Sequence, residues 1–187
     1  LEINSYLPED EKIRVISISR GYPPSDKGYA KLKRAIRKVD KENIFVITVG
    51  PQILYDCTLF GMDRDYAEDP DDFHSYEPAG WAADSFYANP DSYNRRCLLV
   101  PMGSRTYAGW TGTDDYELGC EGGLSWAVPW CAGFYALCCQ VKPDITPGEF
   151  IDVVKSTGIT TDIEHEGQTY EFGKIVNPAG VIEALQE

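Results

Sequence analysis

Histidine and basic residues are scarce in this chain. Only two of its 187 residues are histidines, and 17 lysines and arginines are outnumbered by 30 aspartates and glutamates, which gives a formal net charge of −13. A surface of this charge repels polyanions, so we expect the chain to bind neither nucleic acid nor an anionic membrane. Because histidine is the commonest general base in enzymes, its scarcity also restricts where acid–base catalysis can occur.

Long hydrophobic runs are absent. No stretch approaches the roughly 20 consecutive apolar residues of a membrane helix, and no basic segment followed by an apolar run opens the chain. We therefore expect no membrane partner, and no export signal is visible in the sequence. Because Leu1 is not an initiating methionine, an export signal could lie upstream of it. The 43% of apolar residues fits one domain with a substantial core.

Cysteine pairs with metal-site spacing are missing as well. The six cysteines include no C-x-x-C pair, and four of them lie in or beside apolar runs, where a thiol behaves as a small hydrophobe. Cys138 and Cys139 are adjacent, which is unfavourable for a disulfide framework in a chain of this size. We therefore predict free thiols and a reducing, cytoplasmic location.

The spacing of apolar residues predicts an α/β fold with a mainly parallel sheet. Residues 12–19 form a predicted strand buried on both faces, 27–40 an amphipathic helix and 44–49 a second strand, which together make a parallel crossover. Residues 50–96 lack a pattern and are predicted to form an elaborate loop. The other predicted elements are a buried strand at 97–101, a helix buried on every side at 126–141, an amphipathic helix at 146–155, a hairpin at 160–174 and a closing helix at 178–185.

A serine stands where the predicted central helix begins. Ser125 follows Gly122 and Gly123, and glycine permits the close approach of a substrate backbone. The start of a helix offers free backbone N–H groups and the positive end of the helix dipole, which together can stabilise an oxyanion. A helix-capping serine in a glycine turn is the alternative interpretation of any isolated Gly-x-Ser.

The surrounding residues resemble the nucleophile segment of subtilisin-like serine proteases, the subtilases. That segment is Gly-Thr-Ser-x-Ala-x-Pro followed by a pair of small residues, and the one departure here is Leu124 in place of threonine. The matching residues are Gly123, Ser125, Ala127, Pro129, Ala132 and Gly133. The resemblance implies a three-layer subtilisin-like fold, of a bacterial type, whose buried central helix starts at the catalytic Ser125.

Other segments follow the family's order along almost the whole chain. Residues 16–21 resemble the strand that ends in Ser-Leu-Gly, residues 44–50 the strand that ends in Ala-Ala-Gly-Asn, and residues 173–178 the closing Gly-x-Val-Asn segment. The resemblance implies peptide-bond hydrolysis through an acyl-enzyme on Ser125. It also implies substrate-binding positions at Ser19, Arg20, Gly21, Thr48, Val49, Gly50 and Gly123.

The histidine and aspartate of the catalytic triad are missing from the matched segments. In the family they precede the serine in the order Asp, His, Ser, whereas His74 follows the strands that they should precede and His165 lies in a polar hairpin. Residues 1–187 are thus interpreted as the C-terminal portion of a single peptidase domain, inactive alone. The expected partners are a peptide or protein substrate and the protein's own N-terminal fragment carrying Asp and His.

The oxyanion site also departs from the family. Pro51, which has no N–H, stands where the family has a donating asparagine, and loss of that donor costs a subtilisin about 10²–10³ in rate. Gln52, one position later, is the candidate replacement. A pseudoprotease that binds a peptide or protein in the former cleft is therefore an alternative function.

Two further alternatives concern the type of reaction and a bound metal ion. Gly123 to Ala127 approximates the G-x-S-x-G elbow of α/β-hydrolase esterases, which requires an apolar strand directly before the serine. We expect no cofactor and no metal ligands; calcium at the acidic cluster between Asp63 and Asp72 is the one alternative, since calcium prefers carboxylate ligands.

Overall fold

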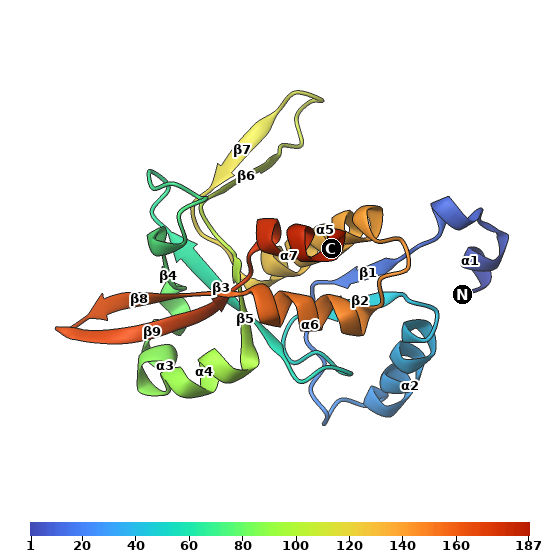
Figure 1. The fold of residues 1–187 in the computed structure, drawn as a ribbon, viewed down its shortest axis with the longest axis horizontal. Helices are drawn as coiled ribbons and strands as arrows, with labels where there is room; N and C mark the ends of the chain where they lie inside the picture. The colour runs from blue at the N-terminus through green and yellow to red at the C-terminus, as the bar shows by residue number, and fades with distance from the viewer.

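A computed structural model describes all residues, 1–187, and consists of three small β-sheets and seven α-helices (Figure 1). The largest sheet has the strand order β4-β3-β5-β9-β8, in which β3 (Thr58–Arg64), β5 (Cys97–Pro101) and β9 (Gln168–Ile175) run parallel. Its two outer strands, β4 (Tyr76–Pro78) and β8 (Ile159–His165), pair antiparallel. The carboxyl ends of the parallel strands therefore meet at one edge, where α/β proteins place their ligands.

The predicted parallel crossover is confirmed. Strand β1 (Val15–Ile18) pairs parallel with β2 (Phe45–Thr48), and helix α2 (Tyr29–Asp40) connects them. The Arg14 guanidinium secures the start of β1, because it donates hydrogen bonds to the carbonyl oxygens of Asn43, Pro143 and Ile145. These bonds fix the crossover against the end of the central helix.

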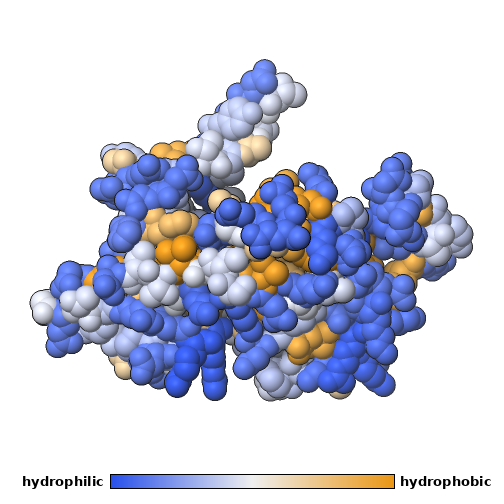
Figure 2. Space-filling view, viewed as in Figure 1, coloured by the Kyte–Doolittle hydropathy of each residue, from blue (hydrophilic) through white to orange (hydrophobic).

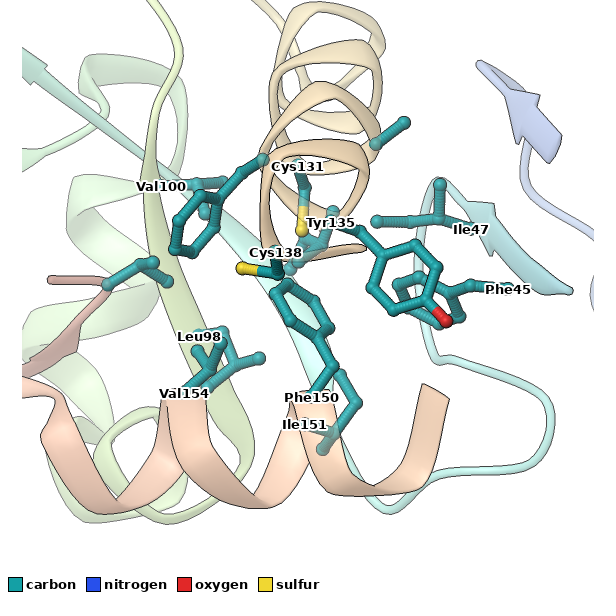
Figure 3. Close-up of a cluster of buried hydrophobic side chains, with 14 of the residues drawn as sticks. Phe45, Ile47, Leu98, Val100, Cys131, Tyr135, Cys138, Phe150, Ile151 and Val154 are labelled. Atoms are coloured by element: carbon teal, nitrogen blue, oxygen red, sulfur yellow. The ribbon is translucent and has the colours of Figure 1, made fainter. Parts of the chain in front are cut away.

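The central helix, α5 (Leu124–Val141), packs against strands of both parallel sheets and fills the larger of two cores (Figure 3). Tyr135 and Phe150 approach each other with ring centroids 5.0 Å apart, and Phe45 of β2 lies 5.3 Å from Tyr135. Aromatic pairs with this edge-to-face geometry add stability beyond the area that they bury. The prediction of a buried helix is confirmed for one side of α5 only, since Trp126 and Leu137 are exposed.

Helices cover both faces of the large sheet, which gives three layers. Helices α6 (Pro147–Thr157) and α7 (Pro178–Gln186) join α5 around the larger core. On the other side, α3 (Ala83–Ala88) and α4 (Pro90–Arg96) enclose the smaller core, in which Phe86 and Phe172 pack edge to face. Thr146 caps the start of α6 as predicted, and it forms a capping box with Glu149. The α6, hairpin and α7 predictions are thus confirmed, and so is the mainly parallel α/β fold.

Two predictions about the fold are wrong. Residues 50–96 are no simple loop, because they contain β3, β4, α3 and α4. Strand β1 is not buried on both faces: Ile16 is 38% exposed and Ser17 is exposed, because β1 pairs with β2 on one side and with no strand on the other. The remaining elements are the short helix α1 (Glu2–Tyr6), three 3₁₀ turns, Glu9–Glu11, Phe73–Ser75 and Gly80–Ala82, and the ribbon of β6 (Arg105–Ala108) and β7 (Tyr116–Gly119).

The face of the molecule shown in Figure 2 is predominantly hydrophilic, and the β6–β7 ribbon projects from the body (Figures 1 and 2). All six cysteines are free thiols, and burial raises the pKa of Cys57 to about 11 and that of Cys138 to about 12. By length and composition α5 could cross a membrane, but its buried residues form part of the protein core.

Candidate active site

Ser125 lies in the first turn of α5, at the carboxyl edge of β1. Gly123 is the N-cap residue, so Ser125 occupies the second helical position, and its side chain is exposed. Its backbone N–H has no hydrogen-bond partner in the protein, as expected for the first turn of a helix. Its carbonyl oxygen accepts a hydrogen bond of 2.9 Å from the Ser19 hydroxyl, directly after β1. The serine and its free N–H thus lie beside the end of β1, as the sequence interpretation predicts.

The ends of β1 and β2 run side by side beyond the strands. The Val49 N–H donates to the Arg20 carbonyl oxygen at 3.2 Å, and a Cβ added to Gly21 would lie 3.3 Å from the Val49 oxygen. The predicted substrate-binding stretches, residues 19–21 and 48–50, are therefore close together. Thr48 is buried, however, so its side chain faces the protein interior.

Gly122 holds the serine segment against the end of β5. A Cβ added to Gly122 would lie 1.9 Å from the Met102 carbonyl oxygen and 2.8 Å from the Gly103 nitrogen, distances that no side chain tolerates. A Cβ added to Gly123 would meet nothing within 4 Å. Two adjacent glycines thus have different functions: Gly122 permits a backbone contact, and Gly123 leaves open space beside Ser125.

We expect the Gly122→Ala substitution to lower the free energy of unfolding by about 1–3 kcal/mol, because the added methyl group forces two backbone segments apart. The matched control is Gly123→Ala, which adds the same methyl group in open space at an extended backbone, φ −143°. That variant should unfold within about 1 kcal/mol of the parent chain. Urea unfolding of both variants measures the difference, and equal stabilities would contradict this packing.

Gln52 does not take the geometry expected of an oxyanion donor. Its side chain is buried, and its amide nitrogen donates to the carbonyl oxygens of Thr48 at 2.9 Å and Gly50 at 3.0 Å. Its amide oxygen accepts from the Thr48 N–H at 3.3 Å. Both amide hydrogens are occupied within the turn, which Gly50 completes at φ +92°, so Gln52 stabilises this turn and has no hydrogen free for an oxyanion. Pro51 is exposed beside it.

Neither histidine is hydrogen-bonded to Ser125. His74 is exposed, and its Nδ1 lies 3.1 Å from an Asp72 carboxylate oxygen. Hydrogen bonding from the His74 backbone and ring lowers the pKa of Asp72. His165 is stacked on Tyr87, with ring centroids 3.7 Å apart. The Ser125 hydroxyl has no side-chain partner within the chain.

The acidic cluster does not form a set of metal ligands. Asp65, Asp69 and Asp72 each accept a hydrogen bond from a backbone N–H two residues further along. No group of three or more histidine, cysteine, aspartate or glutamate side chains is arranged to hold a metal ion. These carboxylates therefore shape their own loop.

Two side chains beside Trp126, the residue after Ser125, were missed by the sequence interpretation. The guanidinium carbon of Arg105 lies 5.8 Å from the centroid of the Trp126 ring, and Tyr107 packs against the same ring at 4.9 Å. Asp63, at the end of β3, faces Gly103. Arg105 and Tyr107 gave no signal in the sequence, because their contacts with Trp126 depend on the placement of β6.

Comparison with known proteins identifies the fold. No protein-family profile and no curated protein matches the sequence. Among solved structures, the chain is similar to a protease from Pseudoalteromonas arctica, with a TM-score of 0.56 and 20% identity over 97% of this chain and 54% of that one. It is also similar to the prenylagaramide maturation protease PagA, with a TM-score of 0.54 and 17% identity over 92% of this chain and 61% of that one.

A structure of the subtilase cytotoxin SubAB matches with a TM-score of 0.62 and 12% identity over 99% of this chain and 62% of that one. The chain has a subtilisin-like fold. This likeness confirms the predicted three layers and the central helix. The chain spans only 54–62% of the length of these three structures.

Proposed function

We propose that this chain forms the serine-bearing part of a subtilisin-like endopeptidase. The observation that carries the proposal is the placement of Ser125, exposed in the first turn of α5 with an unpartnered N–H and beside the end of β1. The N–H can donate to the oxyanion of a tetrahedral intermediate, and the hydroxyl can reach the carbonyl of a peptide lying along residues 19–21 and 48–50.

The proposed reaction forms and then cleaves an ester on Ser125. The serine oxygen bonds to the peptide carbonyl carbon while its proton passes to a histidine, and the C–N bond then breaks as the departing amine takes that proton. Water hydrolyses the ester and restores the hydroxyl. The peptide or protein cut in this way is the proposed substrate, and no cofactor is required for these steps.

The histidine and its aspartate are proposed to come from a segment upstream of Leu1, in the same chain or as a separate N-terminal fragment. The free side of β1 supports this assignment, since strands of parallel sheets are normally covered on both faces and at their edges. Ile13 and Ile16 are 39% and 38% exposed at this strand. A further parallel strand at β1 would cover them and bring new side chains to the edge where Ser125 lies.

The test compares peptide hydrolysis by the 187-residue chain with hydrolysis by a protein extended upstream of Leu1. We expect the extended protein to cleave a fluorogenic peptide library and the 187-residue chain alone to remain inactive. Adding the upstream segment as a separate polypeptide should restore cleavage by the chain. An extended, folded protein that cleaves no peptide would overturn the proposal.

A second candidate function is supported by the oxyanion region. Pro51 cannot donate a hydrogen bond and both amide hydrogens of Gln52 are occupied, so the site has one fewer oxyanion donor than an active subtilase. A pseudoprotease that binds a peptide along the same strand ends would show saturable peptide binding without cleavage. The esterase alternative loses its structural basis, because residues 120–124 separate Ser125 from β7, which belongs to the projecting ribbon rather than to the main sheet.

A further inference from the structure

Arg105 of β6 has a partly buried guanidinium that reaches the first turn of α5. Its Nε and the Oδ1 of Asp63, at the end of β3, are both buried without a hydrogen-bond partner in the protein. Burial lowers the pKa of Arg105 and raises that of Asp63, because it disfavours the charged form of each side chain.

Two contacts connect Arg105 to the serine segment. Its Nη2 donates a hydrogen bond of 3.2 Å to the Met102 carbonyl oxygen, the atom against which Gly122 packs. Its guanidinium lies over the Trp126 ring at 5.8 Å, and Trp126 directly follows Ser125. Contacts thus fix the residues on both sides of Gly123–Ser125 to the end of β5 and to β6.

We propose that Arg105 is a positioning residue, which holds the first turn of α5 so that Ser125 and its N–H stay at the carboxyl edge of β1. The guanidinium supports the Trp126 ring, and Tyr107 packs against the same ring at 4.9 Å. This inference rests on the proposed function for its catalytic meaning, but the positioning itself is a property of the 187-residue chain.

The contacts of residue 105 require the geometry of an arginine rather than that of a lysine. A guanidinium is planar, so one face can stack on an aromatic ring while its edge donates hydrogen bonds in fixed directions. Arg105 does both, toward Trp126 and toward Met102. An ammonium group carries the same charge but cannot make both contacts in one plane.

The experiment measures the position of residue 125 without requiring protease activity. In a Ser125→Cys variant, free N–H groups of the first helical turn lower the pKa of the thiol below its ordinary value of about 8.5. Iodoacetamide alkylation at residue 125, followed by peptide mass spectrometry at several pH values, gives that pKa as the midpoint of the pH–rate profile. The midpoint does not depend on how much space surrounds the thiol.

Arg105→Met and Trp126→Ala are then introduced separately and together. We expect each single change to raise the midpoint by about one pH unit, a tenfold loss of thiolate at neutral pH, and the double change to raise it no further. Trp126→Ala is the control for charge, because it removes the stacking contact and leaves every charge in place. Trp126→Phe, which keeps a ring beneath the guanidinium, should stay within a few tenths of the Ser125→Cys parent.

The outcomes separate the two proposals. A midpoint near 8.5 in the Ser125→Cys parent itself would remove the basis of the proposed function. A lowered midpoint that Trp126→Ala leaves unchanged, or shifts that add in the double variant, would overturn the positioning role alone. Melting temperatures of all variants, taken above the assay temperature, show that the comparison concerns folded protein.

Discussion

Replacing Ser125 with alanine is expected to reduce peptide cleavage by the upstream-extended protein about a millionfold, the loss that follows removal of a serine protease nucleophile. The loss should be in kcat, because the hydroxyl forms its bond only in the reacting complex. Ser125 is exposed and its side chain has no partner within the chain, so the substitution removes no packing. Hydrolysis of a fluorogenic peptide under saturating substrate measures the change.

The Ser125→Ala variant also controls for folding. Its hydrogen bond with Ser19 uses the backbone carbonyl of residue 125, which alanine keeps. We therefore expect its urea midpoint to match the parent within experimental error. Comparable cleavage by parent and variant would show that another residue is the nucleophile.

The largest effect on stability is expected for Phe150→Ala, with a loss of about 3–5 kcal/mol in the free energy of unfolding. Phe150 is fully buried and packs against Phe45, Phe134 and Tyr135, with centroid distances of 5.8, 5.6 and 5.0 Å. Removing the ring leaves a cavity between α5, α6 and β2, which meet in the larger core (Figure 3).

The matched control is Leu137→Ala on α5, where the side chain is 54% exposed. Truncation there should change stability by no more than about 0.5 kcal/mol, because little packing is lost. Thermal or urea unfolding of both variants compares them directly. Similar losses at residues 137 and 150 would contradict the position of the core.

Much of the fold was predictable, in those elements where the local sequence pattern agrees with the burial of the side chains in the folded protein. The 147–157 helix has a capping threonine, a proline at its first position and an apolar stripe, so local signals specify it before any packing. The hairpin around Gly167 is specified similarly, because Gly167 adopts φ +77° at the turn. The central helix was predicted from its apolar run, although sequence alone did not show which of its sides would be exposed.

Strand β3 was missed because tertiary packing decides it. Its residues include Gly61, which is unfavourable in a strand, yet a Cβ there would lie 2.3 Å from the Met102 sulfur. The glycine thus leaves room for the side chain of a residue that is distant in the sequence. Helices α3 and α4 have six and seven residues, too few for an apolar period to emerge.

The candidate site was likewise predictable only in part. The position of Ser125 beside β1 follows from a local motif and the order of the strands, and the structure places it there. The contacts of Arg105 with Trp126 and Met102 depend on how β6 packs against the start of α5, and the hydrogen bonds of Gln52 depend on the path of its turn. No spacing within a single segment could have indicated them.

The most direct measurement is to treat the upstream-extended protein with a fluorophosphonate probe and to map the adduct by peptide mass spectrometry. An activated serine bonds to the phosphorus and displaces fluoride, whereas an ordinary hydroxyl does not react. The account predicts a single adduct, on Ser125, that is absent from the 187-residue chain alone. An adduct on a different residue, or none on a folded extended protein, would contradict it.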